Sequence, residues 1–258
     1  ARLQPYRRMR VWDAAGGGEL AFDADRIARP ELGWIVEHSL LVDRLWHALP
    51  GAGVRVRAPA RAEALEPHED GVRVRLDEGV SLDARLVLAA DGADSSVRSL
   101  AGIEVERQDY GQKGVVAYIA SERPHEDTAW QRFLPTGPLA LLPCTPDAQA
   151  AHVSSIVWTL PNDDADQLLA LDAQAFGVSL TNAFEGRLGA LTLHSNRAAF
   201  PLRRQLANDY AKGRVLLLGD AAHVVHPLAG QGVNLGLRDV STLASMIEAA
   251  NLKRVDWT

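Results

Sequence analysis

Two patterns of hydrophobic residues alternate along the chain. Alternation of apolar and polar positions, typical of strands with one buried face, dominates residues 6–22 and returns in residues 54–82 and 108–160. Nearly continuous apolar runs occupy residues 85–90 and 214–218. Such runs are typical of strands that are buried on both faces, as in a parallel sheet. The pattern therefore predicts two kinds of sheet in one chain.

Turn residues and helical spacing give the local elements. Three consecutive glycines at 16–18 predict a hairpin between residues 6–12 and 19–22, and acidic turns with glycine separate short strands at 54–57, 61–66, 72–76 and 80–82. Apolar residues at helical spacing predict a helix after Ser39, which we expect to be its N-cap, and further helices over 163–184 and 234–250.

The two kinds of sheet come in alternating blocks, which predicts two domains built from interleaved segments. We expect a mixed α/β fold in which an α/β domain alternates with a mostly antiparallel β domain. The segments 1–32 and 108–200 are assigned to the antiparallel β domain, and the segments 33–107 and 201–258 to the α/β domain.

Composition and charge exclude several classes of protein. With 258 residues, 47% of them apolar, the chain can bury a substantial core. A net charge of -6 argues against a nucleic-acid-binding surface, because phosphate binding depends on clustered Lys and Arg. The single cysteine, Cys144, cannot form an internal disulfide, and no Cys/His cluster has zinc spacing. We therefore expect an inert packed thiol, a reducing compartment and no metal.

A glycine and a carboxylate follow each continuous apolar strand. Asp91 and Gly92 follow the first strand, and Gly219 and Asp220 follow the second. At the carboxyl end of a parallel strand, a carboxylate can accept hydrogen bonds from sugar or polyol hydroxyls, while a glycine lets the backbone approach a ligand. The two positions are therefore candidate parts of one ligand site.

A short helix is expected after the first of these turns. Ser95 or Ser96 can cap it, and Arg98 can pair with a ligand phosphate or with Asp94. A capped turn with an internal Arg–Asp pair explains the same residues equally well, so both interpretations remain open at this point.

Further glycines precede the last predicted helix. Gly230 and Gly232 lead into a helix expected to begin at Asn234, which leaves free backbone N–H groups and the positive end of the helix for an anionic or electron-rich ligand. The spacing in GQGVNLG differs from the dinucleotide fingerprint GxGxxG, because the third glycine falls one residue late.

Together these motifs resemble a known family. The segments DGADSSVR (91–98) and GRVLLLGDAAHVVHPLAGQGVNLGLRDV (213–240), separated by a β-rich region, closely resemble the DG and GD motifs of the group A flavoprotein monooxygenases, typified by para-hydroxybenzoate hydroxylase. Within that family, HPLAGQGVNLG and the intervening residues 110–143 are most similar to the ubiquinone-biosynthesis hydroxylases. The resemblance implies a partial, Rossmann-like FAD-binding domain (33–107 and 201–258) and a substrate-binding β domain (1–32 and 108–200).

The resemblance also implies roles for individual residues. Asp220, after Gly219, would bind the ribitol of FAD, Asp91 and Gly92 would lie near its pyrophosphate, and His38 would contact FAD. The isoalloxazine would be lined by Pro227, Gly230, Gln231, Gly232, Val233 and Asn234. Weaker candidates for NAD(P)H binding are Ser95, Ser96 and Arg98.

Histidines and aromatic residues leave alternatives open. His226, with Pro227 beside it, is a candidate catalytic residue that would contact the substrate or stabilise a phenolate. His223 is expected to pack or cap instead. Aromatic side chains of the β domain would form the substrate roof or simply the core; they are Trp130, Phe133 and Trp158.

The function implied by the resemblance is that of an FAD-dependent aromatic hydroxylase. It would use NAD(P)H as co-substrate and insert one oxygen atom of O2 into the ring of a lipophilic phenol or quinol precursor of ubiquinone. The alternatives are a catabolic or secondary-metabolite hydroxylase of the same fold and a non-catalytic scaffold. We expect a cytoplasmic location; peripheral attachment to the inner membrane, a multiprotein biosynthetic complex and a homo-oligomer remain open.

The sequence departs from the family pattern at both ends. Family members begin with a strand, a GxGxxG turn and a helix that hold the ADP half of FAD. This sequence opens in a β segment and stops soon after the last predicted helix. We therefore expect a fragment without the N-terminal GxGxxG unit and the C-terminal helices, one that binds FAD weakly or not at all and is inactive on its own.

Overall fold

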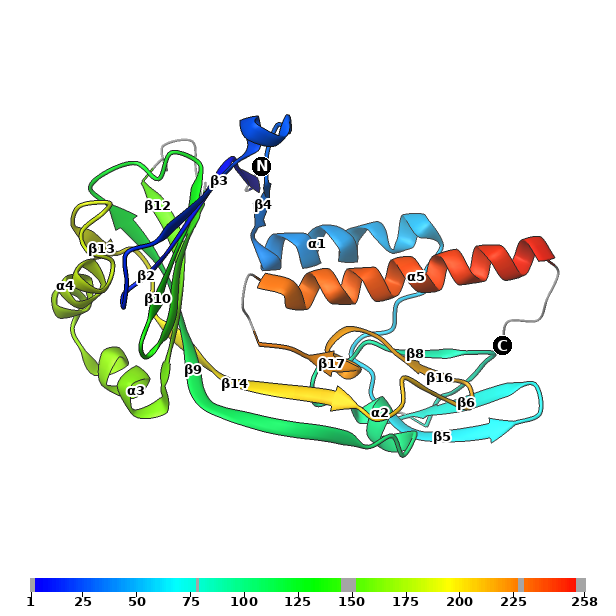
Figure 1. Cartoon of the computed structure of the whole chain (residues 1–258). Coiled ribbons are helices and arrows are strands. Elements are labelled where there is room, and N and C mark those ends of the chain that lie inside the picture. Colours follow the sequence, from blue (N-terminus) through cyan, green and yellow to red (C-terminus); the bar gives the residue numbers. More distant parts are fainter. Residues whose placement is uncertain (1–2, 78, 145–151, 227–229, 254–258) are drawn as a thin grey trace. The chain divides into compact units, whose positions relative to one another are not determined.

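A computed structural model describes residues 3–77, 79–144, 152–226 and 230–253, in two compact units (Figure 1). The first unit is Ala1–Arg55 with Gly111–Pro201, and the second is Val56–Tyr110 with Leu202–Thr258. The chain thus crosses between units within β9 (Val105–Ser121) and again within β14 (Ala198–Ala207). These crossings lie beside the expected boundaries at 107/108 and 200/201, whereas residues 33–55 group with the first unit. The roles assigned to the segments remain predictions.

A mostly antiparallel sheet forms the first unit. Its strands run in the order β9, β12, β11, β10, β2 and β3, with β13 also paired to β9. The expected hairpin is confirmed as β2 and β3, while β2 and β10 pair in parallel. The bounds are β2 (Arg8–Asp13), β3 (Glu19–Asp23), β10 (Thr128–Leu134), β11 (Gly137–Pro143), β12 (Val153–Pro161) and β13 (Leu191–Leu193).

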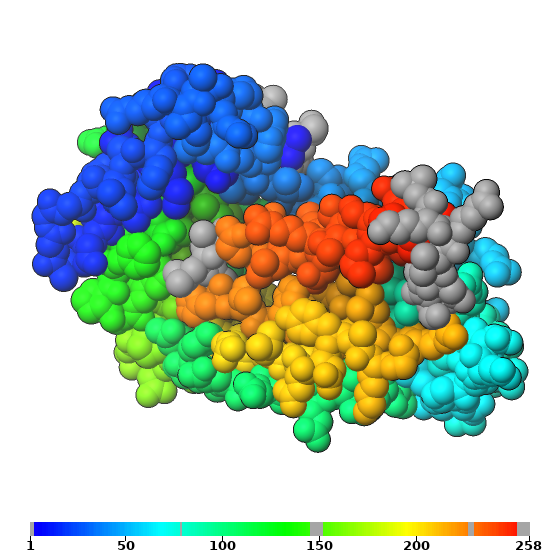
Figure 2. All heavy atoms as spheres, turned by 45° about the vertical axis from the view of Figure 1, so that its right-hand side comes forward, coloured from blue at the N-terminus to red at the C-terminus, as the bar shows by residue number. Residues whose placement is uncertain are grey.

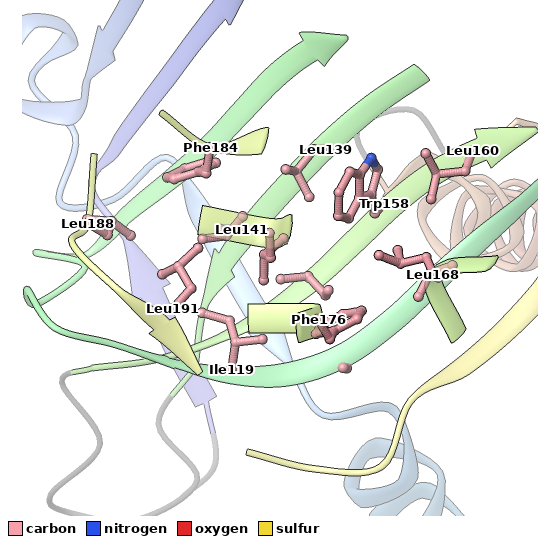
Figure 3. Packing of buried hydrophobic residues seen from close by; sticks show 14 of the residues in the cluster. Ile119, Leu139, Leu141, Trp158, Leu160, Leu168, Phe176, Phe184, Leu188 and Leu191 are labelled. Atoms are coloured by element: carbon pink, nitrogen blue, oxygen red, sulfur yellow. The ribbon is translucent and has the colours of Figure 1, made fainter. Parts of the chain in front are cut away.

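Two helices, α3 (Asn162–Ala170) and α4 (Ala173–Ala183), lie on one face of this sheet (Figure 1). The single helix predicted for 163–184 is wrong, because Leu171 takes an extended conformation and Asp172 caps α4 by accepting a hydrogen bond from the Ala175 N–H at 2.7 Å. Between sheet and helices lies the main core, which includes Ile119, Leu139, Leu141, Trp158, Phe176 and Phe184 (Figure 3).

Smaller elements complete the first unit. They are β1 (Leu3–Tyr6) and β4 (Gly33–Val36), which pair with each other, the short helices η1 (Ala24–Ile27) and η2 (Pro50–Ala52), and α1 (His38–Ala48). Ser39 is not the N-cap of α1: the cap residue is Glu37, and the Ser39 hydroxyl donates to its carboxylate at 2.9 Å. The strand predicted for 54–57 does not form.

Two small sheets form the frame of the second unit. The predicted short antiparallel strands appear as β5 (Ala62–His68), β6 (Gly71–Leu76) and β7 (Ser81–Ala84). The other sheet has the order β15 (Ala211–Lys212), β16 (Val215–Leu217) and β8 (Val87–Ala89), in which β16 and β8 are parallel. Burial of β8 on both faces is wrong, because Leu88 is 46% exposed.

Helices and turns of the second unit follow the ends of these strands. They are α2 (Ser96–Leu100), η3 (Gly219–Ala221), the short strand β17 (His223–Val224) and α5 (Gln231–Lys253). A compact core of small and aliphatic side chains packs around β8 and β16; it contains Ala89, Ile103, Ala207, Val215, Leu217, Ala221 and Ala222. Figure 2 shows α5, coloured orange to red, at the surface.

Two general features bear on the expected classes of protein. Among the helices of the described residues, none combines the length and the hydropathy needed to cross a membrane. Within the same residues, no group of three His, Cys, Asp or Glu side chains is arranged to hold a metal ion.

Phe176 is expected to be a main support of the first unit, because its side chain is fully buried between α4 and the sheet. Replacing a buried Phe by Ala removes apolar contacts and leaves a cavity, so Phe176→Ala should lower the free energy of unfolding by about 4 kcal/mol in denaturant titrations. Val178 lies on the same helix and is 56% exposed, so Val178→Ala should change it by no more than about 0.5 kcal/mol. Equal effects of the two variants would contradict the packing described.

Cys144 should react slowly in the folded protein. Burial raises the pKa of its thiol to about 11, and the thiolate is the reactive form. At pH 8 a disulfide reagent should modify the folded chain roughly 100-fold more slowly than the unfolded chain, whose thiol has a pKa of about 8.5. The rate should rise as the pH approaches 11. If Cys144 is modified at pH 8 as fast in the folded protein as in denaturant, the prediction of an inert thiol is wrong.

Candidate functional site

The two glycine and carboxylate pairs are brought together by the parallel pairing of β8 and β16. Val215 is in register with Val87 and Leu217 with Ala89, so both strands end at the same edge of the sheet. The pairing continues one step further, since the Leu218 N–H donates to the Ala89 carbonyl at 2.9 Å. The turn after β8 and the turn after β16 therefore leave the sheet side by side, which is where open α/β sheets bind ligands.

Arg98 joins the two turns by hydrogen bonds to a backbone carbonyl in each of them. Its guanidinium donates to the carbonyl of Ala221 at 2.8 Å and to the carbonyl of Ala93 at 2.9 Å, and the side chain is only 2% exposed. The Arg98–Asp94 pair, one of the two alternatives left open, does not form: the Asp94 carboxylate accepts from Arg203 at 2.9 and 3.0 Å. Because the buried guanidinium bonds to backbone carbonyls, the geometry favours an internal link over a phosphate contact for Arg98.

Asp91 binds the start of the helix that follows it. Its carboxylate accepts hydrogen bonds from the hydroxyls of Ser95 and Ser96 and from the Val97 N–H at 3.1 Å. Partial burial raises the pKa of Asp91, but these hydrogen bonds outweigh burial and hold the pKa below its usual value. Asp91 is therefore ionised at neutral pH. Its place near a ligand pyrophosphate remains a prediction.

Ser95 and Ser96 differ in their availability for a ligand. Ser95 is 1% exposed, and its oxygen accepts from the Arg98 N–H at 2.9 Å, which makes Ser95 the N-cap of α2 as expected. Ser96 lies in the first turn of α2 and is partly exposed. Of the three weaker NAD(P)H candidates, Ser96 alone retains an accessible side chain.

Asp220 presents a free carboxylate. It lies in the one-turn helix η3, it is exposed, and no hydrogen bond or ion pair to another described residue engages it. Gly219, before it, has a φ of +57°, a conformation that favours glycine. Asp220 thus has acceptor oxygens available for ligand hydroxyls at the mouth of a parallel strand.

The last helix begins earlier than expected. It starts at Gln231 rather than Asn234, directly after Gly230, whose φ of +63° allows the chain to turn into the helix. Its first turn consists of Gln231, Gly232, Val233 and Asn234. The N-terminal end of a helix carries a partial positive charge, which favours an anionic or electron-rich ligand in front of it. Pro227, expected to line the same ligand, lies outside the described residues.

His226 is partly buried and packs edge-on against the Tyr110 ring, with ring centroids 5.1 Å apart. Burial lowers the pKa of His226 below its usual value, so the neutral imidazole is favoured at neutral pH. Its Nδ1 atom is buried and has no hydrogen-bond partner among the described residues.

His223 is held by Asp239, a residue that the sequence analysis did not single out. The Nε2 atom of His223 lies 2.7 Å from Asp239 Oδ2, and the same oxygen accepts from the Gly219 N–H at 2.9 Å. The expectation that His223 packs or caps agrees with this geometry. The available signal was spacing: Asp239 lies three residues after Gly236, on the same face of α5.

The remaining candidates belong to the first unit. His38 is the first residue of α1 and is exposed, and its contact with FAD remains a prediction. Trp158 is buried in the main core, with Trp130 packed against it, whereas Phe133 is 37% exposed. Of these aromatic residues, Phe133 is the most exposed.

Removing the Arg98 link should destabilise the second unit. Arg98→Met retains most of the apolar stem but leaves the carbonyls of Ala93 and Ala221 without their donor, which should lower the free energy of unfolding by about 3 kcal/mol. The control is Arg73→Met, because Arg73 pairs with Asp83 on an exposed strand surface and should cost less than about 1 kcal/mol. Urea titrations compare them, and a similar small loss in both would rule out the link.

Comparison with known proteins identifies the family. A family model described as an FAD binding domain matches residues 23–253. The ubiquinone hydroxylase UbiL of Rhodospirillum rubrum is 41% identical over 98% of this chain and 58% of its own length. The 3-demethoxyubiquinol 3-hydroxylase of Escherichia coli is 37% identical over 99% of the chain and 64% of its own length. The chain therefore spans about three fifths of these relatives.

Solved structures agree with this result. Pseudomonas aeruginosa PqsL, described as a probable FAD-dependent monooxygenase, superimposes in its complex with 2-aminobenzoylacetate with a TM-score of 0.77, at 25% identity over 96% of this chain and 69% of that one. Klebsiella pneumoniae HpxO, solved with FAD and uric acid, gives a TM-score of 0.66 over 92% of this chain and 61% of that one; at 21% identity it shows the fold alone. The chain belongs to the FAD binding domain family, and its resemblance to the group A flavoprotein monooxygenases is confirmed.

Proposed function

We propose that this chain supplies the ribitol and isoalloxazine half of the flavin site in an aromatic hydroxylase. The enzyme would use FAD, NAD(P)H and O2 to hydroxylate a phenol or quinol precursor of ubiquinone. The observation that carries the proposal is the pair of adjacent turns after β8 and β16, one of which presents the free carboxylate of Asp220. The printed names of relatives at 37–41% identity support the reaction and the class of substrate.

The residues present fit FAD. Asp220 offers acceptor oxygens to the hydroxyls of a polyol chain, and the glycine backbones at Gly92 and Gly230 face open space among the described residues, so a flat ring or a phosphate can approach them. The start of α5 supplies N–H donors and a positive helix end, which stabilise negative charge on a flavin ring. When bound, FAD would supply activation of O2 and transfer of one oxygen atom to the aromatic ring.

His226 is the side chain best suited to exchange a proton with a phenolic substrate. Its ring is favoured in the neutral form, as a base requires, and an electron-rich phenolate is a better target for oxygen transfer than a neutral phenol. Tyr110 packs against the ring and fixes its orientation. The task of His226 in the proposed reaction is to accept the phenol proton and return it to the product.

The substrate class also suggests a cellular setting. A polyprenyl phenol is lipophilic, so the enzyme would work at the cytoplasmic surface of the inner membrane, alone or within a biosynthetic complex. A catabolic hydroxylase of small hydroxybenzoates needs no such setting, and a scaffold protein would consume no O2. Product analysis separates all three.

The complete protein encoded by the gene is the right material for this test. With FAD and NADH or NADPH, it should hydroxylate a polyprenyl phenol, detected by mass spectrometry with one atom of 18O from 18O2 in the product. Hydroxylation of hydroxybenzoates alone would favour the catabolic alternative. Absence of both FAD binding and O2 uptake would favour the alternative of a non-catalytic scaffold.

Within this test, Asp220→Ala should weaken FAD binding by about tenfold to a hundredfold, because hydrogen bonds to a charged acceptor contribute about 1.5–3 kcal/mol. The matched control is Asp209→Ala, since Asp209 is also an exposed carboxylate of the second unit, and its dissociation constant for FAD should stay within about twofold of the wild type. Flavin fluorescence titration measures the dissociation constants of both variants. Equal values would show that Asp220 does not contribute to FAD binding.

A further inference from the structure

One carboxylate of α5 links the turn after β16 to the body of that helix. Asp239 Oδ2 accepts the backbone N–H of Gly219 at 2.9 Å and lies 2.7 Å from Nε2 of His223. One donor is the first residue of η3, which also carries Asp220, and the other lies in β17, two residues after η3 ends. Their acceptor lies about two turns along α5 from its start at Gln231. A single side chain therefore bonds to the start of η3 and to the strand that follows it.

The backbones also meet at this point. A Cβ atom added to Gly236 would lie 3.3 Å from the Cα of Gly219, closer than ordinary van der Waals contact. Gly236 and Asp239 are three residues apart and share one face of α5. The helix thus approaches η3 closely through a glycine and bonds to it through the carboxylate one turn further on.

The protonation of His223 follows from its surroundings. A carboxylate is an acceptor only, so the hydrogen bond to Asp239 requires the proton on Nε2. His223 is 8% exposed, and its Nδ1 atom is buried without a partner among the described residues. A proton on Nδ1 would be a buried donor with no acceptor, so the neutral tautomer with its proton on Nε2 fits the site.

Tyr210 lies beside the His223–Asp239 pair. Its ring packs against His223, with centroids 6.0 Å apart. Burial and the nearby negative charge of Asp239 raise the pKa of the Tyr210 hydroxyl. The Asp239 side chain is itself only 26% exposed, so its hydrogen bonds form in a partly desolvated place, where they are stronger than in water.

We propose that Asp239 is a positioning residue of the flavin site, which fixes the turn carrying Asp220 to α5. The inference rests on the proposed function, because both held elements are its flavin-contacting parts. A ligand that uses the Asp220 carboxylate and the first turn of α5 together must find the two at a set separation. Without the Asp239 link, FAD would have to order the turn when it binds, and this would lower the free energy gained on binding.

FAD affinity of the complete protein tests this proposal. Asp239→Asn keeps the size and one acceptor oxygen but lacks the charge, and it turns an amide N–H or a weaker acceptor toward His223. We expect the dissociation constant for FAD to rise at least about tenfold. The control is Glu248→Gln, an equivalent loss of charge at an exposed position of the same helix, which should leave the constant within about twofold.

A second readout separates positioning from general support of the fold. Nitrogen-15 NMR of the imidazole should show the proton of His223 on Nε2 in the wild type and an altered tautomer balance in Asp239→Asn. The spectra are recorded without FAD on samples whose folded state is verified by circular dichroism. A role in fold stability alone would lower the unfolding midpoint but leave the FAD affinity of the folded protein unchanged.

The outcomes are distinct. Weaker FAD binding in Asp239→Asn together with the altered His223 spectrum supports the proposal. Wild-type affinity in Asp239→Asn, or a wild-type His223 with its proton on Nδ1, overturns it while leaving the flavin site in place. A complete wild-type protein that binds no FAD overturns the proposed function, and the positioning role with it. Should Asp239→Asn fail to fold, Asp239→Ser replaces it, which also lacks the carboxylate, and unchanged affinity in that variant overturns the proposal.

Discussion

The parallel pairing of β8 with β16 is the interaction on which the candidate site depends. Hydrogen bonds between these two three-residue strands place the turn after each of them at one edge of the sheet. Such short strands offer few ladder bonds, so other contacts must hold the turns. Arg98 holds the turns through two backbone carbonyls, and Asp239, on α5, holds the turn after β16 through the Gly219 N–H. The site is a small sheet edge reinforced by one buried cation and one partly buried anion.

These two supports leave the ligand-facing groups free. Asp91 binds the hydroxyls and an N–H group at the start of α2, Arg98 binds two carbonyls, and Asp239 binds Gly219 and His223. Asp220, by contrast, is exposed and has no partner among the described residues. Side chains that build the site and side chains that remain for a ligand are thus separated, although all of them are polar and lie in the same two motifs.

The sequence alone predicted the parts of the fold that depend on local pattern. The hairpin of β2 and β3, the short strands β5 to β7 and the parallel pair β8 and β16 follow from alternation, glycine turns and continuous apolar runs. The break between α3 and α4 was missed, because Asp172 can lie inside a helix or cap one, and its neighbours decide which. The exposure of Leu88 was missed because a three-residue strand gives too little pattern to identify an open face.

The candidate site was predicted as a set of residues but not as a network. Carboxylates after strands and glycines before a helix are visible in a sequence. The acceptors of Arg98 are backbone atoms of two alanines more than 100 positions apart, and no side-chain pattern marks them. Asp239 looks like one more polar residue on an amphipathic helix until the turn that it bonds is placed beside it. Partners supplied by the main chain are therefore the information that a sequence motif lacks.

The interleaved order of the units has a consequence for how the chain must fold. Val87 pairs with Val215, a separation of 128 residues, so the strands that carry the site meet only after a very long loop has closed. Most of that loop, Gly111–Pro201, belongs to the first unit, which has a core of its own. Once it is compact, the effective loop is much shorter and its closure costs less entropy. Folding of the first unit before the second would then bring the two strands that carry the ligand site close enough to pair.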